Sequence, residues 1–215
     1  WMPSGVWRNA ENTVSRAGTT VTGYDHLQHV DHYLTHGREY TKEEMWENLE
    51  YWIKIITPVA EEEGIRIGIH PADPPVDSVG GVPRLLNSFA AYKRLVEIVD
   101  SPSNAIEFCQ GTFSEMNDAE GEGIYDMIRY FGERKKILYV HFRNVSNAGE
   151  PFVEEFINTG HVDMIRALKT YKEVGFEGVL VNDHVPVTTG DTRWGHQGRA
   201  YANGYIQALI DVFHD

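Results

Sequence analysis

The chain has 215 residues, of which 41% are hydrophobic and 24% charged, a composition typical of a globular protein rather than a disordered or fibrous one. Its 32 acidic and 19 basic side chains give a formal net charge of −13, which disfavours nucleic acid and anionic membranes as the main partners. The sequence has no run of about 18 apolar residues and only one cysteine, so we expect no membrane span, no internal disulfide and a cytoplasmic location.

The first third of the chain predicts one long helix. A weak strand candidate covers residues 1–7, and the polar stretch 9–40, with four histidines, is expected to be a long excursion from it. Thr41 and Glu44 form a capping-box pattern that precedes apolar residues at helical spacing, so a helix is expected to begin there. Pro58 is a candidate kink in this helix, and Gly64 is its candidate end.

Four short apolar runs, rich in β-branched residues, predict buried strands at residues 65–70, 105–109, 137–142 and 178–183. Helical patterns lie between and after them, at about residues 88–99, 124–131, 162–174 and 199–213. The strands begin at 65, 105, 137 and 178, so they are 40, 32 and 41 residues apart, which is the length of a repeated strand–loop–helix–loop unit.

This alternation predicts an α/β fold in which helices cover a parallel sheet. A closed eight-stranded barrel and an open doubly wound sheet both fit the pattern. No strand is followed by a glycine-rich loop of the dinucleotide or Walker type, so nothing favours a nucleotide-binding fold. The sequence shows no linker, and we expect a single domain over residues 1–215.

Residues that can bind metals stand where the predicted strands end. They are His70, Cys109, His141 and the pair Asp183-His184. The carboxyl ends of parallel strands lie on one face of such a fold, and active sites are built there. Imidazole, thiolate and carboxylate together suit a divalent transition metal, so the sequence predicts a metal site on this face.

Taken singly, each of these residues has an ordinary structural interpretation. A lone cysteine is usually a small buried hydrophobe, a lone histidine a satisfied core or surface group, and an Asp after a strand a helix cap. Four successive strands that each end in a ligand-type residue make the metal site the better interpretation. Glu107 lies on the same side of its strand as Cys109 and remains open as a further carboxylate.

The loops after the strands supply cationic and polar candidates. Arg84 follows a Gly-Gly-Val-Pro approach, and Arg143 and Asn144 follow His141, so these three are candidate substrate-binding residues for a carboxylate. For both arginines, a structural or surface role is the alternative. The irregular segment 190–199 contains His196 and is either a lid over the site or a connection to the last helix.

At these residues the sequence resembles the mannonate dehydratase family. The resemblance covers nearly the whole chain and rests on the following segments: Trp1-Met2-Pro3, Ile69-His70-Pro71-Ala72-Asp73-Pro74-Pro75, Gly81-Val82-Pro83-Arg84, Glu107-Phe108-Cys109-Gln110-Gly111, His141-Phe142-Arg143-Asn144 and Asp183-His184. The proline-rich block and the Cys-Gln-Gly block are highly specific in combination.

The resemblance implies a (β/α)8 TIM barrel of the xylose-isomerase-like kind and the conversion of D-mannonate to 2-dehydro-3-deoxy-D-gluconate and water in hexuronate (glucuronate) catabolism. It implies a divalent metal, typically Mn2+ with Fe2+ or another transition metal as the alternative. The metal would be held by His70, Cys109, His141 and Asp183, while His184 takes part in proton transfer. It also implies a homo-oligomer, a dimer or larger.

Two departures from the family pattern shape these expectations. The family barrel has eight strands and we count five, so about three-eighths of the barrel is expected to be absent at the N-terminal side. The family often has a catalytic tyrosine after the Asp-His pair, and no tyrosine aligns cleanly here. His196 is the expected replacement, and Tyr201 is the weaker candidate.

Dehydration of an aldonic acid requires a base for the C2 proton, an acid for the departing C3 hydroxyl, and stabilisation of the charge that develops beside the carboxylate. The residue types at the predicted face meet these demands. A metal-dependent sugar isomerase or epimerase on the same fold is the nearest alternative, although such enzymes usually bind their metal through Glu and Asp. A phosphodiesterase of the endonuclease type is disfavoured by the charge, and a non-catalytic barrel fragment is the alternative from another class.

Overall fold

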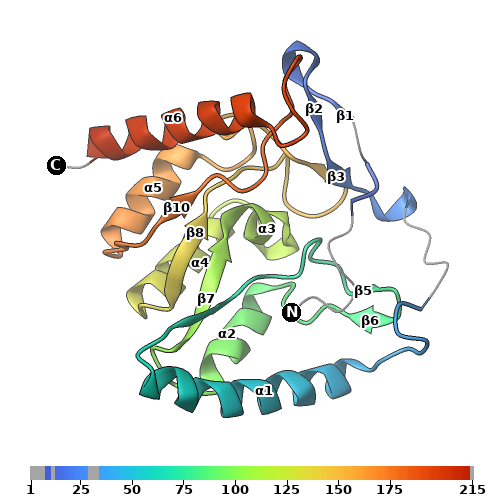
Figure 1. Ribbon diagram of the computed structural model, residues 1–215, viewed down its shortest axis with the longest axis vertical. Coiled ribbons are helices and arrows are strands. Elements are labelled where there is room, and N and C mark those ends of the chain that lie inside the picture. Colours follow the sequence, from blue (N-terminus) through green and yellow to red (C-terminus); the bar gives the residue numbers. More distant parts are fainter. Residues whose placement is uncertain (1–7, 11–12, 29–33, 214–215) are drawn as a thin grey trace.

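The structure is a computed structural model that describes residues 8–10, 13–28 and 34–213 (Figure 1). Its centre is a four-stranded parallel sheet in the order β10-β8-β7-β4. The strands are β4 (Ile67–Ile69), β7 (Asn104–Cys109), β8 (Ile137–His141) and β10 (Leu180–Val181). These are the four apolar runs of the sequence, so the predicted parallel α/β sheet is confirmed. The strand candidate at residues 1–7 lies outside the described residues.

Six helices accompany the sheet in the described part of the chain. They are α1 (Lys42–Glu62), α2 (Phe89–Glu97), α3 (Gln110–Glu115), α4 (Gly123–Glu133), α5 (Met164–Glu173) and α6 (His196–Phe213). All except α3 were predicted from periodicity. Figure 1 shows α1 and α6 on opposite sides of the molecule, with the sheet between them.

The N-terminus of α1 is set by the capping box that the sequence predicts. The Glu44 backbone N–H donates to Thr41 Oγ1 at 3.1 Å, and the Thr41 backbone N–H donates to Glu44 Oε2 at 2.8 Å. The helix continues through Pro58, and Gly64 follows it with a φ of 65°, a conformation that glycine adopts without a steric cost.

Three short antiparallel pairs lie outside the central sheet. Within the polar excursion, β1 (Thr13–Val14) pairs with β2 (Thr20–Val21), and β3 (Gly23–Tyr24) pairs with β9 (Phe152–Val153), which follows β8. In the segment after β4, β5 (Ser78–Val79) pairs with β6 (Val82–Pro83). Single 3-10 turns occupy Arg16–Gly18, His26–Gln28 and Asn117–Ala119. An isolated bridge also joins Thr20 to Val187, so the excursion lies across segments that follow both β8 and β10.

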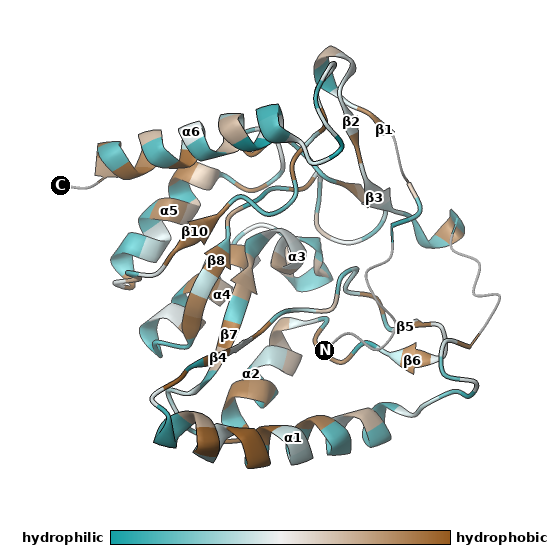
Figure 2. Ribbon diagram, viewed as in Figure 1, coloured by the Kyte–Doolittle hydropathy of each residue, from teal (hydrophilic) through white to brown (hydrophobic). Residues whose placement is uncertain are grey.

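The two faces of the sheet differ in chemistry. Phe108 pairs with Val140 on the face that packs against the helices, and both side chains are completely buried. Hydrophobic residues lie along the strands, while α5 and α6 alternate between hydrophobic and hydrophilic residues (Figure 2). The register also places Glu107 beside Tyr139 and Cys109 beside His141 on the opposite face. The polar residues of the sheet are therefore gathered on the face away from the main core.

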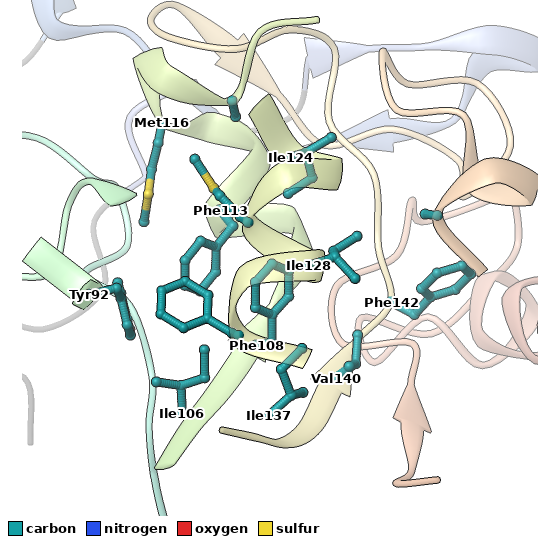
Figure 3. Packing of buried hydrophobic residues seen from close by; sticks show 14 of the residues in the cluster. Tyr92, Ile106, Phe108, Phe113, Met116, Ile124, Ile128, Ile137, Val140 and Phe142 are labelled. Carbon is teal, nitrogen blue, oxygen red and sulfur yellow. The ribbon is translucent and has the colours of Figure 1, made fainter. Parts of the chain in front are cut away.

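Stacked aromatic rings hold the core behind this polar face. The Phe108 and Phe113 rings are 4.1 Å apart between centroids and nearly parallel (Figure 3). Phe131 meets Phe113 edge-on, and Tyr171 meets Phe108 edge-on. Phe108 and Phe113 flank Cys109 in the sequence, so packing of this core fixes where the cysteine lies. Among the described residues, no helix has the length and apolar character needed to cross a membrane.

We expect Phe108→Ala to lower the free energy of unfolding by about 3–5 kcal/mol, because it removes a fully buried ring and leaves a cavity among other rings. Denaturant titration would measure the loss. Val212→Ala on the exposed side of α6 is the control and should change stability by less than about 0.5 kcal/mol. A comparable effect of the two substitutions would contradict this account of the core.

Candidate metal centre

The ends of three strands bring a thiol and two imidazoles to one point. Ligand atoms of His70, Cys109 and His141 all lie within 4.8 Å of one another. Asp183 joins them from the end of β10, with its Oδ2 at 3.7 Å from Cys109 Sγ and 3.4 Å from His141 Nδ1. The four predicted metal ligands are thus neighbours, as expected for residues at the carboxyl ends of parallel strands.

A turn after β10 lets adjacent residues serve the same site. Asp183 has a φ of 52°, in the left-handed region, so the chain leaves the extended path there. Arg199 holds this turn, because its Nη1 donates to the Asp183 carbonyl and to Asn182 Oδ1, both at 2.7 Å. His184 Nε2 consequently lies on the same side as Asp183, 3.7 Å from Asp183 Oδ1. On a regular strand the two side chains would face opposite ways.

The proline-rich loop orients His70. Its Nδ1 donates to the Pro71 carbonyl at 2.7 Å, which leaves Nε2 as the nitrogen with a free lone pair. Metal-binding histidines commonly use their second nitrogen in this way. The hydrogen bond therefore fixes the tautomer that a metal ligand requires.

His141 has the same pattern with a carboxylate in place of the carbonyl. Its Nε2 lies 2.9 Å from Glu107 Oε1, while its Nδ1 faces Asp183 and Cys109. That Nδ1 atom is buried and has no hydrogen-bond partner of good geometry among the described residues. Glu107, left open by the sequence, thus faces the cluster and lies against His141, a predicted ligand.

The electrostatics of the cluster suit a cation. Burial opposes the charged form of Cys109, but Arg143 and the two histidines outweigh it and lower the pKa of the thiol to about 6. Burial likewise opposes protonation of His70, yet the sulfur of Cys109 and the carboxylate of Glu107 raise its pKa to about 9. Asp183, Cys109 and Glu107 outweigh burial at His141 and raise its pKa to about 12. In the metal-free protein, protons on the imidazoles of His70 and His141 balance the negative charge of the neighbouring thiolate and carboxylates.

Arg143 occupies the centre of a buried ionic network beside the cluster, with its side chain 2% exposed. Its Nε donates to Asp183 Oδ2 at 2.8 Å, and its Nη1 donates to Glu115 at 3.0 Å and to Glu154 at 2.9 Å. Its Nη2 donates to Asp73 at 3.4 Å and to the Thr112 hydroxyl at 3.0 Å. The guanidinium thereby links the Asp183 carboxylate to the segments that follow β4, β7 and β8.

Arg8 shares this network. It forms ion pairs with Asp73 and with Glu154, whose Oε1 it meets at 3.2 Å, and its Nη2 lies 3.6 Å from Glu115. Burial, together with the charge of Asp73, raises the pKa of Glu115 well above its usual range. Burial also disfavours the charge of Glu154, but Arg143, His184 and Arg8 outweigh it and lower its pKa to about 2. Glu154 is therefore the carboxylate that stays ionised.

Two predicted substrate-binding residues, Arg143 and Asn144, are held by hydrogen bonds to protein groups in this structure. All five N–H groups of Arg143 are engaged by protein acceptors, so none is left for a substrate carboxylate. Asn144 is fully buried and its amide bonds only to the backbone of residues 145, 157 and 162. Both residues follow β8, as the sequence predicts, and their role as substrate contacts stays a prediction.

The remaining predicted site residues, Arg84, His196 and Tyr201, contact other protein groups. Arg84 is buried, its Nη1 donates to the Asp73 carbonyl at 2.8 Å, and burial lowers its pKa to about 10. His196 is exposed at the start of α6, where its Nδ1 contacts the Thr192 hydroxyl at 2.8 Å. Tyr201 contacts Asn158 Oδ1 at 2.9 Å. No contact recorded within residues 34–213 joins His196 or Tyr201 to the four ligand residues.

Sequence reasoning missed Arg8, Glu115 and Glu154. Each is a single charged residue in a segment with no motif of its own, and it reaches the site only through the tertiary fold. Gly111 offers the one local signal. A Cβ at that position would lie 2.3 Å from Arg143 Cζ, so the Cys-Gln-Gly block needs glycine where the guanidinium passes.

We expect Arg143→Lys to cost about 3 kcal/mol of stability, because one ammonium group cannot replace a planar fork that contacts four carboxyl groups, three of them buried. Arg166→Lys is the matched control: Arg166 pairs with Glu122 on the surface, and the change should cost less than about 1 kcal/mol. Chemical denaturation of both variants checks this. Equal losses would show that the buried network is not a major source of stability.

We also expect Mn2+ affinity to rise with pH between about pH 6 and pH 8, by roughly tenfold to a hundredfold per pH unit. The raised pKa values of His70 and His141 mean that a metal must displace protons from them, and it competes better as protons become scarce. Calorimetric titration in two buffers of different ionisation enthalpy would count the protons released. A pH-independent affinity with no proton release would contradict the assignment of these ligands.

Two solved structures resemble this chain in fold. The crystal structure of mannonate dehydratase from Streptococcus suis serotype 2 superposes with a TM-score of 0.82 and 26% identity, covering 96% of this chain and 62% of that one. A xylose isomerase-like TIM barrel protein from Mycobacterium smegmatis, solved in complex with magnesium, matches at a TM-score of 0.56 and 11% identity over 83% of this chain and 55% of that one, a likeness of fold alone. The fold is thus related to xylose-isomerase-like TIM barrels.

Among curated sequences, mannonate dehydratase 2 of Halalkalibacterium halodurans is 36% identical over 177 residues, and the mannonate dehydratase of Enterococcus faecalis is 38% identical over 180. Each alignment covers 80% of this chain and 48% of the relative, so the chain spans about half the length of the curated relatives it matches. The sequence model of the D-mannonate dehydratase (UxuA) family matches residues 8–215. The chain therefore belongs to the D-mannonate dehydratase (UxuA) family.

Proposed function

We propose that this chain carries the metal-binding and proton-transfer residues of a hydro-lyase that converts D-mannonate to 2-dehydro-3-deoxy-D-gluconate and water. The observation that carries the proposal is the convergence of His70, Cys109 and His141, with Asp183 beside them, in a member of this family. The reaction places the protein in hexuronate catabolism.

The donor set fits a divalent transition metal, for which Mn2+ is the proposed ion and Fe2+ the alternative. A buried His141 nitrogen without a hydrogen-bond partner, a His70 tautomer with Nε2 available, and a thiol of lowered pKa all support this assignment. His70, Cys109, His141 and Asp183 would hold the ion. Bound there, the ion would supply Lewis-acid stabilisation for negative charge on the substrate carboxylate and 2-hydroxyl oxygens.

The protein groups divide the remaining tasks. His184 is half-exposed and its Nε2 lies on the Asp183 side, so it is the proposed group that exchanges a proton with the substrate. Arg84 is the proposed partner for the substrate carboxylate, since Arg143 is fully engaged. His196 remains the proposed second proton-transfer group, with Tyr201 the weaker candidate. Both come after the Asp183-His184 pair in the sequence.

The same proposal includes the domain organisation, the cellular location and the oligomeric state. The single domain over residues 1–215 would be the C-terminal part of a (β/α)8 barrel whose four described strands are β4, β7, β8 and β10. We propose a cytoplasmic location, since a lone thiol used as a metal ligand suits a reducing compartment. We propose a homo-oligomer, a dimer or larger, which sedimentation analysis would test.

The decisive experiment is incubation of the purified protein with D-mannonate and Mn2+, followed by identification of the product. We expect a 2-keto-3-deoxy acid and no reaction after the metal is chelated. An isomeric sugar acid of unchanged mass would indicate an epimerase or isomerase instead. An unchanged substrate over a range of metals would indicate a non-catalytic barrel fragment and overturn the proposal.

Adjacent substitutions should separate metal binding from proton transfer. We expect His184→Asn to retain the metal and lose turnover by about 10²-fold or more, the usual contribution of a positioned acid or base. Asp183→Asn should instead weaken metal affinity. Metal content and dehydration rate are measured on both variants. Near-normal turnover in His184→Asn would remove this residue from the mechanism, and loss of metal would make it a ligand.

A further inference from the structure

A carboxylate that neither the sequence motifs nor the ligand set includes lies directly behind His184. Glu154 Oε1 is 3.0 Å from His184 Nδ1, and the Glu154 side chain is 3% exposed while that of His184 is 39% exposed. The carboxylate is thus enclosed by protein, and the imidazole ring lies between it and the open side of the site.

The contact defines which nitrogen of His184 is reactive. An ionised carboxylate only accepts hydrogen bonds, so the Nδ1 atom facing it carries the hydrogen. Nε2 is then the nitrogen with the lone pair, and it is the one that lies toward Asp183, at 3.7 Å from Oδ1. When Nε2 gains a proton, the positive charge of the imidazolium rests against a fixed negative charge.

Two guanidinium groups keep Glu154 in place and charged. Arg143 Nη1 donates to its Oε2 at 2.9 Å, and Arg8 Nη2 donates to its Oε1 at 3.2 Å. Glu154 therefore keeps its ionised form although it is buried.

The backbone on both sides of the pair is held by one short segment of the excursion. The Glu154 backbone N–H donates to the Thr22 carbonyl at 2.8 Å, just after β9 pairs with β3. Thr20 exchanges two hydrogen bonds with Val187, three residues beyond His184, at 3.0 and 2.9 Å. Residues 20–24 consequently set the position of Glu154 relative to His184.

We propose that Glu154 is the positioning residue for His184: it holds the imidazole as the Nδ1–H tautomer, with Nε2 directed toward the metal-ligand cluster. This inference rests on the proposed function for its catalytic consequence, but the tautomer itself is a property of the free protein. Glu154 does not touch the substrate and acts only through His184.

The chain offers a matched control for the variant Glu154→Gln. Glu115 is equally buried, and its Oε1 accepts a hydrogen bond from the same Arg143 Nη1 at 3.0 Å. Within the described residues, no hydrogen bond or ion pair joins it to His184. Glu115→Gln replaces a carboxyl group of the same buried network by an amide and leaves the His184 contact in place. A general disturbance of the network would affect both variants alike, whereas loss of the His184 contact affects only Glu154→Gln.

We expect Glu154→Gln to lower kcat by about 10²-fold or more with little change in KM, since it releases an oriented acid–base group and leaves substrate contacts intact. In a His184→Asn background, Glu154→Gln should cause no further loss of kcat. The effect of Glu115→Gln should be the same in both backgrounds. Equal losses for Glu154→Gln with and without His184 would overturn the proposal, because its action would not pass through that histidine.

Nitrogen-15 NMR of histidine-labelled, metal-free protein tests the tautomer without turnover. We expect a hydrogen-bonded Nδ1–H signal that disappears in His184→Asn, is lost or strongly shifted in Glu154→Gln and persists in Glu115→Gln. An Nε2–H signal for His184 in the unaltered protein would overturn the proposal. If the unaltered protein does not dehydrate D-mannonate, the proposed function fails, and this measurement still decides the role of Glu154.

Should Glu154→Gln fail to fold, Glu154→Asp replaces it. Aspartate keeps the charge that Arg8 and Arg143 need but withdraws the carboxylate by one methylene from the ring. We expect the same loss of kcat and the same change in the Nδ1–H signal. Turnover and an NMR signal like those of the unaltered protein would contradict the proposed contact.

Discussion

The burial of one guanidinium group is the constraint on which the site depends. Arg143 is removed from water together with three carboxyl groups and contacts a fourth, Asp183, that is partly exposed; breaking one buried pair of this kind typically costs about 3–5 kcal/mol. Such a network is stable only in one arrangement, since every donor of the planar fork has a specific acceptor. Asp183 is one of those acceptors, so the orientation of a proposed metal ligand is inherited from the ionic network and does not depend on the metal.

The same network explains how a cluster with an excess of negative charge exists inside a folded protein. Arg143 lowers the pKa of Cys109 and offsets the charge of Asp183, while protons on His70 and His141 supply further positive charge. Metal binding would exchange those protons for a divalent ion with little change in the net charge of the site. The ligands can therefore be preorganised, which reduces the reorganisation that binding requires.

The strand ends were predictable from the sequence because hydrophobic periodicity is local, and parallel strands bring their carboxyl ends together wherever they occur. For this reason His70, Cys109, His141 and Asp183 were found without any tertiary information. The protein partners of Arg143 and Asn144 were not predicted, since a sequence does not show whether donors are already satisfied. Glu154 was missed because it approaches His184 across 30 residues through pairing between β9 and β3, and two-residue strands leave no periodic pattern.

Part of the polar excursion, residues 20–24, holds the loops that carry Glu154 and His184. Its polar sequence predicted only a long excursion from the first strand. In the structure its residues 20–24 bond to the backbone beside both Glu154 and His184, and Gly23 approaches Phe152 so closely that a Cβ would lie 2.3 Å from the carbonyl oxygen. A short segment can position a reactive group when it ties together two loops that the sheet already holds near each other. The geometry of His184 thus depends on backbone hydrogen bonds made by residues 20–24.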